Sequence, residues 1–264
     1  MQQIPEELVQ TLMKMTGGSR EDVLDMLDRS RREMSKPHSS SSATDSSKKK
    51  DSYTRTSYPH FIECEGVLKY TLRITLKGSK PAIWRKIEVP SNISLRHLGD
   101  LILDLMGWSG GHLNQFRKGN DRYLPYYQRA ASGEDDFIWE CNNLNQEDFS
   151  IADLLTKKAQ TVIFEYDFGD SWEHEIRLSS IDTYNDKEKR EIVFLNGKRD
   201  CPPEDCSGIW GYEELLEILS RLKAGKRLSS DEKEQLEWAG WDKSYDPEYL
   251  DVEYCREIAE QYND

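Results

Sequence analysis

Apolar and polar side chains alternate along residues 68–77, and this alternation restricts the possible folds more than any other feature. Leu68, Tyr70, Leu72, Ile74 and Leu76 are apolar, whereas the residues between them are Lys, Thr or Arg. A period of two places successive side chains on opposite faces of a strand, so one face is buried and the other contacts water. The chain is therefore expected to build a sheet with one covered face.

Other segments predict further strands and helices. Strands are expected over residues 83–89, 112–117, 122–126, 161–166 and 172–180, with a short one near 137–140 inside a long polar loop over residues 128–148. Helices are expected after Ser94 and Ser150, which stand at N-cap positions, and over residues 212–223, 230–238 and 252–262. Strands and helices are mixed without strict alternation. This order predicts an α+β fold, with a mostly antiparallel twisted sheet packed with helices.

Composition divides the chain into three parts. Residues 1–34 contain two apolar stripes separated by two glycines, which predicts a short helical hairpin that weakly resembles ubiquitin-associated (UBA-like) modules. Residues 35–57 are rich in Ser and Lys and almost devoid of apolar side chains, so a disordered linker is expected. Residues 58–264 would then form the α+β domain. The hairpin is the candidate docking element for an unknown protein partner.

The net charge of −13 limits the classes of function. The first 57 residues are near neutral, so the acidic charge lies in the α+β domain, where it disfavours general nucleic-acid binding. The five cysteines are thinly scattered and do not suggest a disulfide framework. The sequence has no apolar run long enough for a membrane span and no secretory signal. We therefore expect an acidic cytoplasmic protein without a membrane partner.

The stretch YDFGDSWEHEI, residues 166–176, holds most of the candidate chemistry. Its Asp-Phe-Gly also occurs in protein kinases, but the phosphate loop, strand lysine and catalytic loop of a kinase are missing from the sequence. A serine recombinase would need an Arg-rich site and a basic DNA-binding element, which the acidic domain lacks. The period of two places Trp172 and His174 on the buried face of a strand. With Asp167 and Asp170 in the preceding turn, the candidate catalytic residues are Asp167, Asp170 and His174.

The loop CPPEDCSG, residues 201–208, holds a second cluster. Cys201 and Cys206 could bind zinc with two further ligands, form a redox pair, or be buried as small apolar residues. Glu204 and Asp205 place two carboxylates between them. The candidate metal ligands are therefore Cys201, Cys206, His174, Glu204 and Asp205, with zinc or manganese as the divalent metal.

Two polar loops rich in aromatic residues indicate a shared cleft. Its candidate lining residues are Trp172, His112, Trp210 and Tyr212. His174 has a simpler alternative, since a buried imidazole usually hydrogen-bonds a backbone carbonyl or a carboxylate. The basic and aromatic residues between 117 and 127 could stack nucleic-acid bases, but a solvated hairpin tip is the favoured interpretation.

Five segments stand in an order that resembles a known family. They are LRITLKGSKPAIWRKIEVP, LGDLILDLMGWSGGHLNQF, YDFGDSWEHEI, CPPEDCSGIWGYEELLE and WDKSYDPEYLDVEYCREI. Over about residues 70–264 they resemble the plasmid pRiA4b open-reading-frame-three-like family, also called insertion-element passenger TnpR-like proteins. The resemblance implies an α+β fold and no established activity. Members more often carry His-Leu-His-x-Phe, whereas this chain has Asn114 in place of the second His.

These observations leave three functions open. The first is a non-catalytic binding or accessory protein of the mobile-element-associated type. The second is a metal-dependent hydrolase or nuclease that uses Asp167, Asp170 and His174 together with Glu204 and Asp205. The third is a nucleic-acid-binding protein.

Overall fold

The computed structural model describes residues 58–126, 128 and 142–263. The chain divides into two compact units, Met1–Thr54 and Arg55–Asp264, and the described residues belong to the second. The predicted hairpin over residues 1–34, the linker over 35–57 and the short strand near 137–140 lie outside the described residues. Within the described ranges, no helix is both long and apolar enough to cross a membrane.

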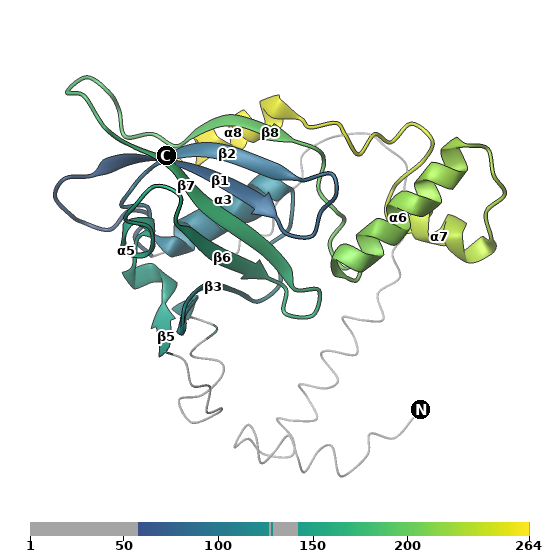
Figure 1. Ribbon diagram of the computed structural model, residues 1–264, viewed down its shortest axis with the longest axis horizontal. Helices are drawn as coiled ribbons and strands as arrows, with labels where there is room; N and C mark the ends of the chain where they lie inside the picture. The colour runs from purple at the N-terminus through teal and green to yellow at the C-terminus, as the bar shows by residue number, and fades with distance from the viewer. Residues whose placement is uncertain (1–57, 127, 129–141, 264) are drawn as a thin grey trace, which may run out of the picture. The chain divides into compact units, whose positions relative to one another are not determined.

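Eight strands form one sheet, in the order β5-β4-β3-β6-β7-β1-β2-β8 (Figure 1). Their bounds are Leu68–Leu76 (β1), Trp84–Pro90 (β2), Asn114–Lys118 (β3), Asp121–Leu124 (β4), Asn142–Asn145 (β5), Thr161–Tyr166 (β6), Trp172–Thr183 (β7) and Val193–Lys198 (β8). Neighbouring strands run antiparallel, except that β4 and β5 are parallel. The predicted α+β class with a mostly antiparallel sheet is confirmed.

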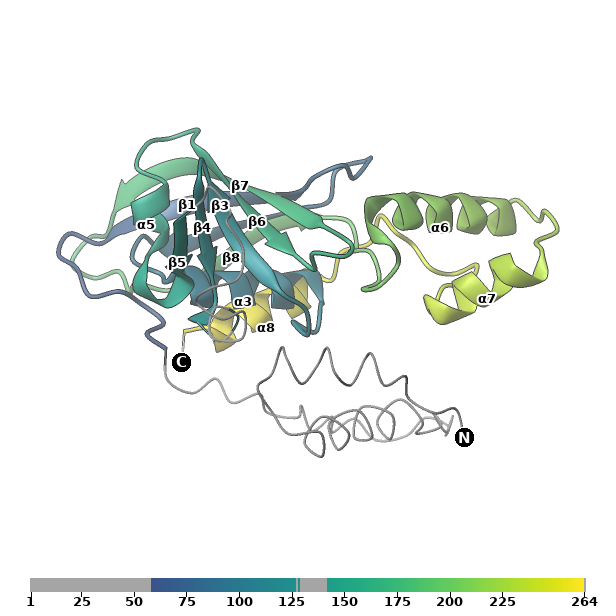
Figure 2. The same cartoon turned by 90° about the horizontal axis from the view of Figure 1, so that it is seen from below.

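The helices differ in where they lie relative to the sheet. Their bounds are Leu95–Met106 (α3), Ile151–Leu154 (α5), Gly208–Lys223 (α6), Ser230–Trp238 (α7) and Val252–Gln261 (α8), with a 3-10 turn, η1, at Gln146–Asp148. Helices α3 and α8 lie on one side of the sheet, α6 and α7 lie at one end of it, and α5 lies toward the other end (Figures 1 and 2). Figure 2 shows α3 and α8 beneath the sheet, while α6 and α7 lie side by side and extend away from it. We refer to α6 and α7 as the helical arm.

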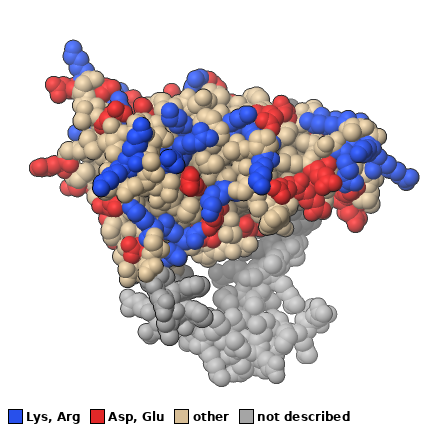
Figure 3. All heavy atoms as spheres, in the orientation of Figure 1, with Lys and Arg blue, Asp and Glu red and all other residues tan. Residues whose placement is uncertain are grey.

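The alternation over residues 68–77 has the predicted structural effect. Leu72, Ile74 and Leu76 of β1 are buried in the core, as are Ile176 and Leu178 of the neighbouring strand β7. Figure 3 views the molecule from the side opposite α3 and α8, where basic and acidic side chains are interspersed. One face of the sheet is therefore covered by helices and the other is polar, as the period of two requires.

Helix α3 begins and ends at two capping residues, Ser94 and Gly107. The side chain of Ser94 accepts a hydrogen bond from the amide of His97, and Gly107 adopts a left-handed conformation with a φ of 77° at the C-cap. A glycine is favoured there because it takes positive φ without a steric penalty. The cap turns the chain directly into Trp108, which begins the loop that leads to the site described below.

Two strands were not expected from the sequence. Strand β5 and the turn η1 lie in the region predicted as a long loop, because the Asn-rich sequence of β5 has low strand propensity. Strand β8 lies at the edge of the sheet, beside β2. Only Phe194 along it is fully buried, so no clear alternation marks this strand.

Candidate functional site

Three loops meet at one end of the sheet. Because β3 pairs with β6, the loop before β3 lies beside the hairpin between β6 and β7, and the amide of Asp167 donates to the Leu113 carbonyl at 2.8 Å. The third loop, residues 199–207, leads into α6. Gly208 lies so close to the hairpin that a Cβ there would be 2.5 Å from the Asp170 carbonyl oxygen. The structure thus brings the acidic hairpin and the cysteine-containing loop into contact.

Each of these loops contributes one side chain to a compact group of three. Asp167 Oδ2 lies 3.7 Å from His112 Nδ1, and Asp205 Oδ1 lies 3.1 Å from His112 Nε2. One ligand atom from each of the three residues lies within 4.8 Å of the other two. The side chain of Asp205 is 62 % exposed and that of Asp167 is 13 % exposed, so the group opens toward solvent on one side.

The backbone holds both aspartates in an uncommon conformation. Asp167 has a φ of 55° and Asp205 a φ of 61°, although neither is a glycine. Such a conformation costs about 1 kcal/mol or more per residue, and it is found preferentially at functional sites. In the hairpin, Asp167 Oδ1 accepts a hydrogen bond of 2.9 Å from the amide of Gly169, so its other oxygen is free to face His112.

The group of three has the composition of a divalent-metal site. Imidazole nitrogen and two carboxylate oxygens are suitable ligands for zinc or manganese. Tetrahedral zinc bonds of about 2.0–2.2 Å place ligand atoms about 3.3–3.6 Å apart, so a bound ion would draw the three side chains inward by about 1 Å. Three protein ligands would leave at least one position open to water. Among the described residues, this is the one group of three or more His, Cys, Asp or Glu side chains whose ligand atoms all lie within 4.8 Å of one another.

Glu204 lies beside this group and joins two of the loops. Its carboxylate accepts hydrogen bonds from the Tyr166 hydroxyl at 2.6 Å and from the Ser109 amide at 2.9 Å. The Tyr166 hydroxyl in turn lies 3.4 Å from the amide nitrogen of His112. Burial, followed by the hydrogen bond to Glu204, raises the pKa of Tyr166, so its hydroxyl stays protonated and continues to donate. These contacts fix the position of the His112 backbone.

His174 lies apart from this group, inside the core. It is fully buried, its Nδ1 lies 3.3 Å from the Phe164 carbonyl oxygen, and its ring packs edge-on against Trp108 at 5.3 Å. Burial lowers the pKa of His174 to about 4, which keeps the imidazole neutral at physiological pH. Within the described part of the chain its Nε2 has no hydrogen-bond partner. The arrangement matches the simpler alternative, a buried ring beside a backbone carbonyl.

The remaining candidates from the hairpin and the cleft divide by exposure. Trp172 and Tyr212 are buried in the core, whereas Trp210 is 79 % exposed near the start of α6. Asp170 keeps one carboxylate oxygen buried, for which the described residues offer no hydrogen-bond partner. Their proposed roles in catalysis or in a cleft stay predictions.

The two loop cysteines are free, buried and in separate environments. Cys201 Sγ lies 3.0 Å from Arg85 Nη2 and 3.1 Å from Met106 Sδ, whereas Cys206 Sγ lies 3.7 Å from the Gly208 carbonyl oxygen. Burial raises the pKa of both thiols to about 12. A metal ligand must be a thiolate, so both cysteines are poorly prepared for zinc. Their metal role stays a prediction that this geometry does not favour.

Three of the described basic and aromatic residues between 117 and 127 are engaged within the protein, whereas Tyr126 is exposed. Arg117 forms ion pairs with Glu165 and Glu173, and Arg122 donates to two backbone carbonyls of its own turn. Tyr123 is buried. Base stacking by this hairpin stays a prediction. The contacts described leave few of its side chains available to a nucleic acid.

Sequence reasoning missed three residues that shape the site, namely Trp108, Ser109 and Tyr166. Trp108 and Ser109 directly follow the glycine that ends α3, and the glycine-rich run after them was the available signal. Tyr166 ends a strand whose alternation indicated only that it faces inward. Its partner Glu204 is 38 residues away in the sequence, so no local pattern could have revealed the pair.

Comparisons with known proteins agree with this fold. The family description "Plasmid pRiA4b ORF-3-like protein" matches residues 69–254. The uncharacterized protein y4hQ of Sinorhizobium fredii (strain NBRC 101917 / NGR234) is 31 % identical over 170 residues, which are 64 % of this chain and 79 % of that protein. The crystal structure of MM3350, a protein of unknown function from Methanosarcina mazei Go1, aligns with a TM-score of 0.57 and 29 % identity, covering 71 % of this chain and 96 % of that one. The chain therefore belongs to the plasmid pRiA4b ORF-3-like family.

Proposed function

We propose that this chain is a binding protein that holds a divalent cation, zinc or manganese, between His112, Asp167 and Asp205. The observation that carries the proposal is the convergence of these three side chains, from three separate loops, to within 4.8 Å. Two of them occupy left-handed backbone conformations, which the fold maintains at a cost in stability. The cation would occupy the open side of the group, where Asp205 is exposed.

Two further features support this location. The hydrogen bonds from Tyr166 and Ser109 to Glu204 stabilise the loops that present His112 and Asp205. In addition, a carboxylate oxygen lies close to each ring nitrogen of His112, 3.7 Å from Nδ1 and 3.1 Å from Nε2. Both aspartates are therefore near an ion that binds the imidazole.

The test is a calorimetric titration of chelator-treated protein, purified without a histidine tag, with zinc and with manganese salts. We expect one ion per chain, and we expect Asp205→Asn and Asp167→Asn to weaken binding by about tenfold or more. Asparagine tolerates the left-handed conformation and can keep the turn hydrogen bond, so these variants remove charge with little change of shape. Glu213→Gln, on the exposed side of α6, is the matched control and should bind as the wild type does.

An absence of saturable heat with both metals would overturn the proposal. So would asparagine variants that bind as tightly as the wild type, because the cation would then lie elsewhere.

A second candidate function is metal-dependent hydrolysis. It is favoured by the open side of the group, since catalytic metal sites combine three protein ligands with a position for water or substrate. Hydrolysis of bis(p-nitrophenyl) phosphate by the manganese-loaded protein, lost in Asp205→Asn, would support it. Turnover no faster than that of the metal salt alone would leave the non-catalytic binding role. An accessory role linked to mobile elements stays a prediction, as does a protein partner for residues 1–34.

A further inference from the structure

A cavity lies where the sheet meets the helical arm, and we call it the second cavity to separate it from the group of His112, Asp167 and Asp205. Its volume is about 330 Å³, and its walls come from the end of α3, from the Cys201–Glu204 loop and from the segment between α7 and α8. Figures 1 and 2 show the helical arm extending from the sheet at this junction. Ligand sites occur preferentially at boundaries of this kind, and about 300 Å³ is the lower limit of their usual size.

The charge of the cavity is negative. Asp200 and Glu204 contribute carboxylates, and the residues that line it include no Lys, Arg or His. Behind the wall, the guanidinium of Arg85 lies 3.0 Å from Cys201 Sγ, but Arg85 is only 2 % exposed and donates to several backbone carbonyls, including that of Leu105 at the end of α3. An anionic ligand would therefore meet two carboxylates and no accessible cation.

Both carboxylates are held in place before any ligand arrives. Asp200 accepts hydrogen bonds of 2.9 Å from the Cys201 amide and of 2.9 Å from the Tyr245 hydroxyl. Glu204 accepts from the Ser109 amide at 2.9 Å, from the Ser109 hydroxyl at 3.1 Å and from the Tyr166 hydroxyl at 2.6 Å. An ionised carboxylate has about four acceptor positions, so these bonds fix both side chains and leave more capacity for a ligand on Asp200 than on Glu204. A site with fixed charges loses little entropy on binding.

Aromatic rings form part of the walls. Trp108, Trp241 and Tyr245 line the cavity, where the two tryptophans are only 4 % and 6 % exposed and present part of their rings. Trp241 stacks on Tyr245 with ring centroids 4.3 Å apart. The Trp108 indole nitrogen donates to the Pro202 carbonyl at 2.8 Å, which fixes the orientation of that ring. Aromatic faces attract organic cations through their quadrupole, and the attraction is strongest for Trp.

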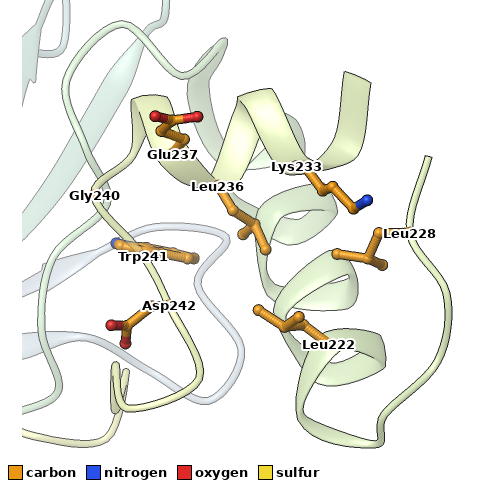
Figure 4. A pocket seen from close by; sticks show the side chains of 8 residues that line it. All are labelled: Leu222, Leu228, Lys233, Leu236, Glu237, Gly240, Trp241 and Asp242. Carbon is orange, nitrogen blue, oxygen red and sulfur yellow. The ribbon is translucent and has the colours of Figure 1, made fainter. Parts of the chain in front are cut away.

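The neighbouring pocket provides a contrast. It shares Gly240 and Trp241 with the second cavity, but Leu222, Leu228 and Leu236 converge in it (Figure 4). Lys233 also lines that pocket, so it combines an apolar surface with both signs of charge. Of these two cavities, only the second one is lined by carboxylates and several aromatic rings without any basic residue.

We propose that this second cavity binds a small organic cation, of the alkylammonium class. Two fixed carboxylates match its charge, and the rings of Trp108, Trp241 and Tyr245 match its alkyl groups. A hydrated metal ion would gain little from three aromatic walls, whereas a methylated ammonium gains from both features.

The test compares choline with 3,3-dimethylbutan-1-ol, which has the same shape but carries no charge. Binding to the full chain, treated with EDTA so that the site of His112 plays no part, is followed by two-dimensional NMR of the tryptophan indole groups. We expect saturable shifts with choline and at least about tenfold weaker binding of the neutral alcohol. Asp200→Asn should weaken choline binding by about tenfold, whereas Glu237→Gln, in the neighbouring pocket of Figure 4, should not change it.

Equal binding of choline and the neutral alcohol would overturn the proposal, because an apolar pocket would then suffice. Failure of choline to produce saturable shifts would overturn it as well. The comparison of the two ligands uses the wild-type chain, so it decides the question even if Asp200→Asn does not fold.

Discussion

Lowering the pH from 7 to 4 is expected to destabilise the protein through His174. This side chain is fully buried against Trp108 and Phe164, and its ring has no carboxylate partner among its described hydrogen bonds. Burial lowers its pKa to about 4, from the 6.5 of an exposed histidine. The unfolded chain therefore binds a proton at a higher pH than the folded chain does. Stability is fully present above pH 6.5 and is lost as the pH falls toward 4.

The size of the effect follows from these two pKa values. A histidine that titrates at 6.5 when unfolded and at about 4 when folded lowers the free energy of unfolding by about 2 kcal/mol at pH 5 and about 3 kcal/mol at pH 4. This is a large share of the 5–15 kcal/mol that typically stabilises a folded domain. Carboxylates also titrate in this range, so the total loss must be separated from that of His174.

Urea denaturation of the wild type and of His174→Leu at pH 7, 5 and 4 makes this separation. Leucine fills part of the same apolar site and cannot be protonated, so the variant should lose about 3 kcal/mol less than the wild type between pH 7 and 4. If the difference between wild type and His174→Leu does not change with pH, His174 is accessible to protons in the folded state and the reasoning fails.

Two further substitutions test the packing of the loops. Gly208→Ala should destabilise the protein by about 2 kcal/mol or more and weaken cation binding, because the new Cβ would collide with the Asp170 carbonyl. Gly225 is the control: it has a similar φ but no atom close to a new Cβ, so Gly225→Ala should lower the free energy of unfolding by only about 1 kcal/mol. Equal losses for the two alanine variants in urea denaturation would refute the close contact. Tyr166→Phe removes the hydrogen bond to Glu204 and should cost about 1.5–3 kcal/mol, so a melting curve like that of the wild type would show that the bond contributes nothing.

Features that depend on local sequence were predictable. The alternation over residues 68–77 identified β1, which spans Leu68–Leu76, and Ser94 with Gly107 marked both ends of α3. Caps and alternation act through neighbouring residues, so they can be read without knowing the fold. Strand β5 was missed because it forms only by parallel pairing with β4, which supplies stability that its Asn-rich sequence does not indicate.

The candidate site was predictable in its residues more than in its arrangement. Asp167, Asp205 and His112 were all named from the sequence, but His174 was expected to be their companion. The alternation of side chains along β7 correctly predicted that His174 points into the core. It could not reveal that the pairing of β3 with β6 places His112, and not His174, beside Asp167. That relation joins residues 55 positions apart and depends on the register of the sheet, which is a property of the whole fold.

The central claim, a divalent cation held by His112, Asp167 and Asp205, is tested most directly by anomalous X-ray diffraction from crystals soaked in zinc or manganese salts. The account predicts one strong anomalous peak within about 2.0–2.3 Å of a His112 ring nitrogen and of a carboxylate oxygen from each aspartate. Crystals of Asp205→Asn should show a weaker peak or none. A strong peak elsewhere on the described domain, with nothing between these three side chains, would contradict the account.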